Sequence, residues 1–117
     1  MGKLTTHVLD TSAGMPAAGI RIELHALAAA GPALLAATAT GHDGRCAAPL
    51  LAGSDFRGGR YALTYFVSEY FLTRGVALPV PPFIEDVVVR IGIAHPTEHY
   101  HVPLLISPWS YSVYRGG

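Results

Sequence analysis

The chain has 117 residues, of which half are hydrophobic and 14% are charged, so its length favours one domain with one core. Eight basic and eight acidic residues cancel, and this balance gives no indication of a nucleic acid or an anionic membrane as partner. Cys46 is the only cysteine, which excludes an internal disulfide and suits a reducing compartment. Residues 1–7 show no signal-peptide pattern, and no apolar run is long enough to span a bilayer. We therefore expect a cytoplasmic protein.

Apolar residues alternate with polar ones along most of the chain, as they do in strands that bury one face. The clearest case is residues 20–27, where every second residue from Ile20 to Ala26 is apolar. Gly31-Pro32 follows as a turn, so the next strand is predicted to return as a hairpin. In chain order, the predicted strands are residues 4–9, 20–27, 34–40, 60–67, 86–93 and 99–106.

Loops, a tight turn and one helix are predicted between these strands. Ser68 is expected to cap a short helix that ends before Gly75. The predicted loops are residues 10–18 and 51–59, the tight turn is residues 41–44, and the prolines that exclude regular structure are Pro79, Pro81 and Pro82. Short alternating strands with one marginal helix predict an all-β fold, an antiparallel two-sheet β-sandwich over residues 1–117.

The last predicted strand presents two imidazoles on its polar face. His99 and His101 share that face, and the opposite face is apolar. Pro103 interrupts the hydrogen-bond ladder, so the strand is predicted to lie at a sheet edge or to contain a bulge. The tail that follows carries Tyr111 and Tyr114, and we expect it to be docked, on this subunit or on another one.

A few polar positions are candidates for chemistry, although none of them forms a known catalytic motif by itself. They are His7, Arg45, His101, Tyr114 and Arg115. The competing interpretation is a solvated strand residue for each histidine and a surface arginine after a turn for Arg45. His99 and His101 could also be read as a metal pair, but no carboxylate or cysteine lies at a recognised ligand spacing, so we predict no metal site.

Several sequence blocks occur in an order that resembles the transthyretin-related family, and within it the 5-hydroxyisourate hydrolases. These blocks are Leu4–Asp10, Gly14–Ala17, Asp43–Arg45, Arg60-Tyr61, Tyr70-Phe71, His99–Pro108 and Tyr111–Gly116. The last two separate the hydrolases from transthyretins, which lack the histidines and the closing Tyr-Arg-Gly-Ser. The chain departs from that pattern at Gly117, where the family has serine.

The resemblance implies a transthyretin-like sandwich of about eight strands with one short helix. It implies a homotetramer, a dimer of dimers, with active sites in a channel between the dimers. The implied reaction is hydrolysis of 5-hydroxyisourate to 2-oxo-4-hydroxy-4-carboxy-5-ureidoimidazoline in urate (purine) degradation. No cofactor and no metal are expected for it.

The resemblance also implies roles for individual residues. We expect His7, Arg45 and His101 to be catalytic, with a neutral imidazole of His7 or His101 taking the proton from water. Arg45 would keep that imidazole neutral by charge repulsion and would hold the anionic substrate, as His7 also would. Tyr114 and Arg115 are expected to bind substrate and close the pocket. The choice between the two histidines as base stays open.

Two other interpretations compete with hydrolysis. The first is a transthyretin-type small-ligand binding protein without catalysis, which the fold alone would permit. A hydrophobic carrier channel, however, has no need for His7, Arg45 and His101 to converge. The second is a structural sandwich domain of a larger assembly, which the family blocks at both ends of the chain argue against.

Overall fold

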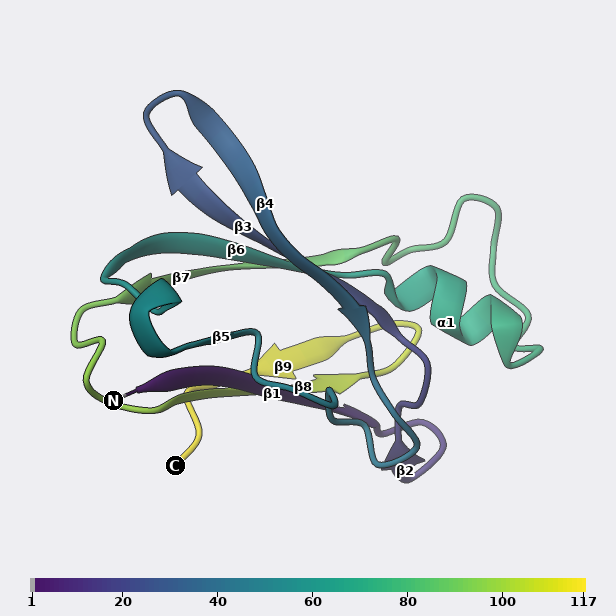
Figure 1. The fold of residues 1–117 in the computed structure, drawn as a ribbon. Coiled ribbons are helices and arrows are strands. Elements are labelled where there is room, and N and C mark those ends of the chain that lie inside the picture. The colour runs from purple at the N-terminus through teal and green to yellow at the C-terminus, as the bar shows by residue number, and fades with distance from the viewer. Residues whose placement is uncertain (1) are drawn as a thin grey trace.

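The computed structural model describes residues 2–117, and its two β-sheets face each other with one helix at one end (Figure 1). Met1, the first residue of the predicted 1–117 domain, lies outside the described residues. One sheet has the order β2-β1-β8-β9, with β5 also paired to β1, and the other has the order β4-β3-β6-β7. The elements are β1 (Lys3–Asp10), β2 (Met15–Pro16), β3 (Arg21–Ala28), β4 (Gly31–Ala39), β5 (Leu51–Ala52), η1 (Gly53–Asp55), β6 (Gly59–Tyr65), α1 (Val67–Thr73), β7 (Val87–Ile93), β8 (Tyr100–Ile106) and β9 (Tyr111–Val113).

The core lies between the two sheets and is filled by the apolar face of each strand. The alternation predicted for the last long strand is confirmed, since β8 turns Tyr100, Val102, Leu104 and Ile106 inward. Burial of one such side chain contributes roughly 1.5–3 kcal/mol to the free energy of unfolding. The all-β sandwich and the β3–β4 hairpin are confirmed. The hairpin turn is Ala29-Ala30, however, and not Gly31-Pro32, which are the first residues of β4.

One strand pair departs from the predicted antiparallel pattern. β1 and β8 run parallel, with Thr5 opposite His101 and His7 opposite Pro103, whereas the other strand pairs are antiparallel. A parallel pair needs a long crossover connection, and here the connection runs through the entire other sheet. This pairing brings the first and last predicted site segments side by side.

The prediction that Pro103 marks an edge or a bulge is wrong. β8 lies between β1 and β9, and its pairings show no register shift. The Tyr114 N–H still donates to the Pro103 carbonyl oxygen at 3.4 Å. Pro103 has no N–H to donate back to the segment at Tyr114, so the ladder loses one hydrogen bond there. An interior strand can accommodate proline at that cost.

Three local predictions also need correction. Ser68 does not cap α1, because Phe66 is the N-cap residue and the Ser68 N–H donates to the Glu85 carbonyl oxygen at 3.1 Å. The predicted loops 10–18 and 51–59 contain the short elements β2, β5 and η1. The helix does end before Gly75, whose φ of 81° favours glycine. Within residues 2–117 there is no helix with the length and apolar character needed to cross a membrane.

Candidate functional site

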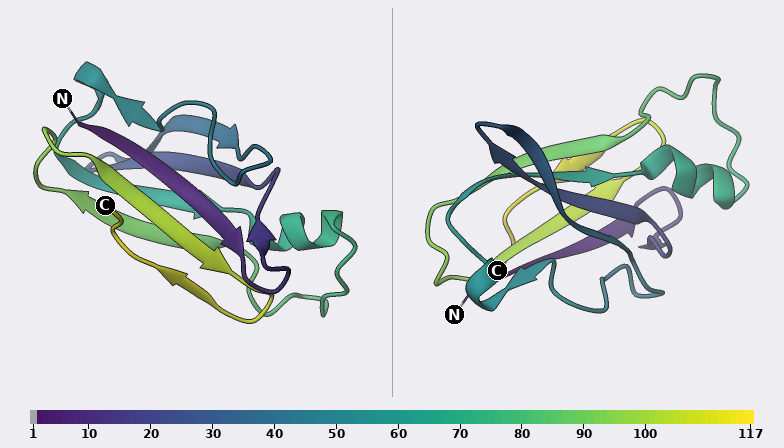
Figure 2. Two further views of the ribbon diagram at one scale, coloured as in Figure 1. Left: turned by 90° about the horizontal axis from the view of Figure 1, so that it is seen from below. Right: turned by 45° about the horizontal axis from the view of Figure 1, so that its top comes forward.

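Three of the predicted site residues lie on the outer face of the five-stranded sheet, the face turned away from the core. The left view of Figure 2 looks onto this face, with β1, β8 and β9 in front and the C-terminus lying over them. His7 is on β1, His101 is on β8, and Arg45 forms an isolated antiparallel bridge with His7. Residues paired across such a bridge point to the same side, so the structure brings these three together.

The turn of residues 41–44 holds Arg45 beside His7. The Gly44 N–H donates to the Gly41 carbonyl oxygen at 2.9 Å, and Gly44 has a φ of 78°. A Cβ at Gly44 would collide with the Val8 carbonyl oxygen, so only glycine fits this approach. Asp43 accepts a hydrogen bond from the Arg45 N–H at 3.0 Å, which lowers the pKa of the Asp43 carboxyl.

His7 is half-buried, and one of its two ring nitrogens is hydrogen-bonded. Its Nε2 lies 2.9 Å from the main-chain carbonyl oxygen of Asp43. A carbonyl oxygen only accepts, so Nε2 carries the proton in this bond. In the neutral form of His7, the lone pair is therefore on Nδ1, the nitrogen nearer the main chain.

His101 is half-buried and is held on two sides. Its Nδ1 lies 2.8 Å from the hydroxyl oxygen of Thr5. On the other side, a Cβ at Gly116 would lie 2.9 Å from His101 Cδ2, so the main chain of the tail packs against the ring. Burial, followed by the positive charges of Arg45 and His7, lowers the pKa of His101, and this favours the neutral imidazole near pH 7.

Tyr114 and Arg115, the two predicted site residues of the C-terminal tail, point to opposite sides of the sheet. Gly116 pairs with His101 and Val113 with Leu104, so the same register places Tyr114 on the outer face. Arg115 instead turns toward the start of β8, where its guanidinium donates to a Glu98 carboxylate oxygen at 3.0 Å. It also lies 3.9 Å from the centre of the Tyr100 ring. Within this subunit, the structure does not bring Arg115 beside the two histidines.

Thr5, Gly44 and Gly116 are site residues that sequence reasoning missed. Thr5 stands two residues before His7 on the same strand, so its face was predictable, but its partner His101 was not. Gly44 and Gly116 lie inside the sequence blocks identified above, yet nothing in the sequence shows that each lies against a histidine ring. Both contacts depend on strand pairing between distant segments.

A recess of about 290 Å³ adjoins this site. Its lining contains the two cations Lys3 and Arg45, and it contains no carboxylate. Such a lining favours an anionic group. Within residues 2–117, no group of three or more His, Cys, Asp or Glu side chains is placed to hold a metal ion.

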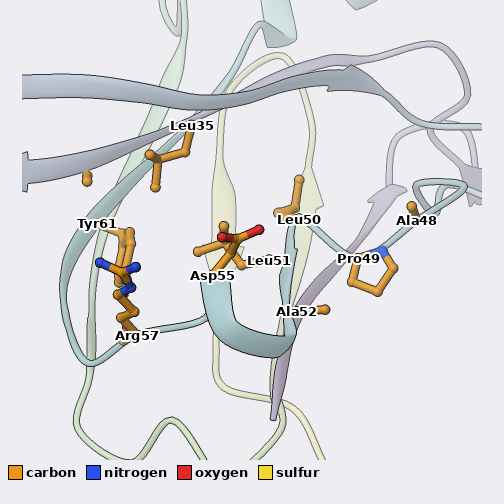
Figure 3. Close-up of a pocket in the computed structure, with 10 residues that line it drawn as sticks. Leu35, Ala48, Pro49, Leu50, Leu51, Ala52, Asp55, Arg57 and Tyr61 are labelled. Carbon is orange, nitrogen blue, oxygen red and sulfur yellow. The ribbon is translucent and has the colours of Figure 1, made fainter. Parts of the chain in front are cut away.

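A larger hollow of about 800 Å³ lies elsewhere, beside the β4 strand and η1 (Figure 3). Its lining is Ala26, Leu35, Ala48, Pro49, Leu50, Leu51, Ala52, Asp55, Arg57 and Tyr61. None of the predicted site residues is among them. This larger hollow is therefore lined by other residues than those of the candidate site.

Comparison with known proteins identifies relatives over the whole chain. A protein named 5-hydroxyisourate hydrolase from Pseudomonas aeruginosa is 55% identical over 99% of this chain and 92% of its own length. A protein of the same name from Mesorhizobium japonicum is 51% identical over 98% of this chain and 92% of its own length.

Solved structures agree with these relatives. Klebsiella pneumoniae 5-hydroxyisourate hydrolase matches with a TM-score of 0.83 and 32% identity, over 100% of both chains. (S)-allantoin synthase matches with a TM-score of 0.94 and 45% identity over 99% of this chain, which spans 44% of that longer chain. A family model described as the HIUase/Transthyretin family matches residues 4–116. The chain therefore belongs to the HIUase/Transthyretin family.

Proposed function

We propose that the protein hydrolyses 5-hydroxyisourate to 2-oxo-4-hydroxy-4-carboxy-5-ureidoimidazoline, a step of urate degradation. The observation that carries this proposal is the placement of His7, Arg45 and His101 on one sheet face. The names of relatives that are about half identical over nearly the whole chain support it. The reaction adds water at a ring carbonyl, breaks the carbon–nitrogen bond, protonates the nitrogen and leaves a carboxylate.

His101 is our choice for the general base. A base must reach the attacking water with a free ring nitrogen and must be neutral at working pH. The distal nitrogen of His7 is bound to the Asp43 carbonyl oxygen, whereas the bond to Thr5 engages the proximal nitrogen of His101. The lowered pKa of His101 keeps this ring neutral. His7 would then orient water or substrate through its fixed ring.

Arg45 would hold negative charge on the substrate and on the oxygen of the tetrahedral intermediate. Its planar guanidinium suits paired oxygen and nitrogen acceptors of a urate-like ring. The recess lined by Lys3, Thr5 and Arg45 offers an anion-favouring surface next to it. Fixed positive charge at a developing oxyanion is one of the largest contributions to catalysis in such reactions. The proposed mechanism uses no cofactor.

We further propose that the protein acts as a homotetramer, a dimer of dimers, in the cytoplasm. The outer sheet face carries the candidate site and is open to another subunit, and Tyr114 on this face is 57% exposed. Tyr114 and Arg115 would complete the pocket together with a neighbouring subunit. Cys46, the only cysteine, has no partner for an internal disulfide, which is compatible with a reducing compartment. Light scattering at micromolar concentration tests the tetramer, and a monomer would contradict it.

The decisive experiment follows the ultraviolet absorbance of freshly generated 5-hydroxyisourate. The absorbance should decay faster with the protein than without it, and the His101→Ala variant should largely abolish the acceleration. The rival function is ligand binding without catalysis, which is represented by the sea bream transthyretin solved in complex with thyroxine, with 27% identity and a TM-score of 0.86. Binding of the substrate without faster decay would favour that rival.

A further inference from the structure

We propose that Thr5 is a positioning residue that sets the tautomer of His101, so that the Nε2 lone pair faces the attacking water. The inference rests on the proposed hydrolysis for its role in catalysis. Its structural part, the bond between the Thr5 hydroxyl and His101 Nδ1, can be tested without any substrate.

Two consecutive threonines of β1 form side-chain hydrogen bonds to β8, one on each face of the sheet. On the outer face, the Thr5 hydroxyl lies 2.8 Å from His101 Nδ1. On the inner face, the Thr6 hydroxyl donates to the Val102 carbonyl oxygen at 2.7 Å. The parallel register pairs Thr5 with His101 and Thr6 with Val102, so each threonine binds the residue beside it. The ring and the main chain that carries it are thus fixed by adjacent residues.

Thr6, on the inner face, is also hydrogen-bonded to the opposite sheet. Thr6 is buried and uses its hydrogen to bond Val102, so Tyr65 of β6 must donate its hydroxyl hydrogen to Thr6 Oγ1 at 2.8 Å. Burial raises the pKa of Tyr65, so the phenol keeps that hydrogen. The separation of β1 and β8 beneath His101 is therefore set by a buried, fully hydrogen-bonded network.

The orientation of the His101 ring is fixed as well. A half-turn of the imidazole would place Cδ2 against the Thr5 hydroxyl and lose the hydrogen bond. The Gly116 main chain packs against Cδ2 in the observed orientation. Among residues 2–117, Thr5 is the only hydrogen-bond partner of the ring, so Nε2 remains available for water.

The bond between Thr5 and His101 Nδ1 is compatible with either neutral tautomer, because a hydroxyl can donate or accept, and catalysis requires one of the two. A neutral imidazole has one donor and one acceptor nitrogen, so the direction of the bond at Nδ1 decides whether Nε2 carries the proton or the lone pair. If Nδ1–H donates to Thr5, Nε2 has the lone pair and can accept the proton of water. The positive charges of Arg45 and His7 act on this ring and disfavour a second proton. In this tautomer, with Thr5 as the acceptor, His101 has the form that a general base requires.

The test compares Thr5→Val, which keeps shape but removes the hydroxyl, with Thr5→Ser, which keeps the hydroxyl. We expect Thr5→Val to lower kcat about 10- to 100-fold with little change in KM, because a misplacement of ~1 Å at a catalytic group can cost ~100-fold. Thr5→Ser should retain most of the activity. Thr64→Val, the same substitution on a strand of the other sheet, is the matched control and should behave as wild type.

A substrate-free readout separates this inference from the proposed function. Long-range proton–nitrogen NMR of nitrogen-labelled protein, with His101 assigned by its loss in His101→Gln, should place the neutral-state proton on Nδ1. In Thr5→Val, the proton should redistribute toward Nε2, and Thr5→Ser should restore it. If the protein shows these tautomers but does not hydrolyse 5-hydroxyisourate, the proposed function is refuted while the role of the Thr5–His101 bond in setting the tautomer is supported. An Nε2–H tautomer in wild type, or a folded Thr5→Val with wild-type kcat, would overturn the inference.

Discussion

Gly116 and His101 form an antiparallel bridge in which the Gly116 N–H donates to the His101 carbonyl oxygen at 2.7 Å. The approach is so close that a Cβ on Gly116 would lie 2.9 Å from His101 Cδ2 and 3.1 Å from Pro103 Cγ. Glycine near the end of the chain therefore lets the tail rest on the ring of the proposed base. The tail thereby becomes one wall of the candidate site.

We predict that Gly116→Ala lowers kcat by about 10-fold or more, since a displacement of ~1 Å at a reacting group can cost ~100-fold. The added methyl must push the tail or the His101 ring aside. Gly117 is the matched control, because a Cβ there meets nothing within 4 Å. Gly117→Ala, and Gly117→Ser, which restores the serine of the family pattern, should change the rate little. Steady-state kinetics with each variant decide the point.

The second prediction concerns the three converging side chains. His7→Ala, Arg45→Ala and His101→Ala should each lower kcat by ~100-fold or more, the usual effect of losing a general base or a charge stabiliser. All three project from the outer sheet face, so circular dichroism and thermal unfolding should stay close to wild type. His25→Ala, on a strand of the other sheet, should keep full activity. Wild-type rates in all three folded variants would refute the site.

The charge on Arg45 should control the titration of His101. Burial, Arg45 and His7 hold the pKa of His101 below its ordinary value of 6.5, so activity should fall as the pH drops through this lowered pKa and the base takes up a proton. Arg45→Gln removes one repelling charge and should raise the pKa of His101, whereas Arg45→Lys should leave it nearly unchanged. NMR titration of His101 measures its pKa in both variants. A pKa of His101 that is unchanged or lower in the Arg45→Gln variant would show that the Arg45 charge does not repel the protonated ring.

Hydrolysis should not depend on a metal ion. In the proposed mechanism, His101 moves the proton and Arg45 stabilises the oxyanion, so activity should survive exhaustive chelation. The control is the chelated protein with zinc added back, which should show no gain. If activity were lost and zinc restored it, His99 and His101 would become ligand candidates and the proposed mechanism would have to be abandoned.

Removal of residues 114–117 should separate activity from stability. The deletion loses two main-chain hydrogen bonds to β8, a half-exposed ion pair between Arg115 and Glu98, and the hydrogen bond from Arg115 to the His99 carbonyl oxygen. Net contributions of such bonds are on the order of 1 kcal/mol each, so urea unfolding should show only a modest loss of stability. Turnover should fall by ~100-fold, because the tail no longer supports His101. Unchanged turnover in the truncated protein would refute a role for the tail.

The sequence predicted most of the strands and which face of each is buried. Residues 20–27 and 100–106 show why, since the side-chain period of a strand is a local property that the residue order records directly. Residue order also led to His7, Arg45 and His101, through sequence blocks that resemble a known family. Pro103 was misplaced because a proline limits only its own hydrogen bond and cannot reveal how many neighbours its strand has.

Tertiary structure alone decided how these segments meet. Thr5 and His101 are 96 positions apart, and no local pattern indicates that β1 and β8 pair in parallel with these residues opposite each other. The antiparallel pairing of the C-terminal tail with β8 places Gly116 against the imidazole and turns Tyr114 and Arg115 to opposite sides. Side-chain periodicity is set by each strand on its own, whereas register between distant strands is set by the packing of the whole core.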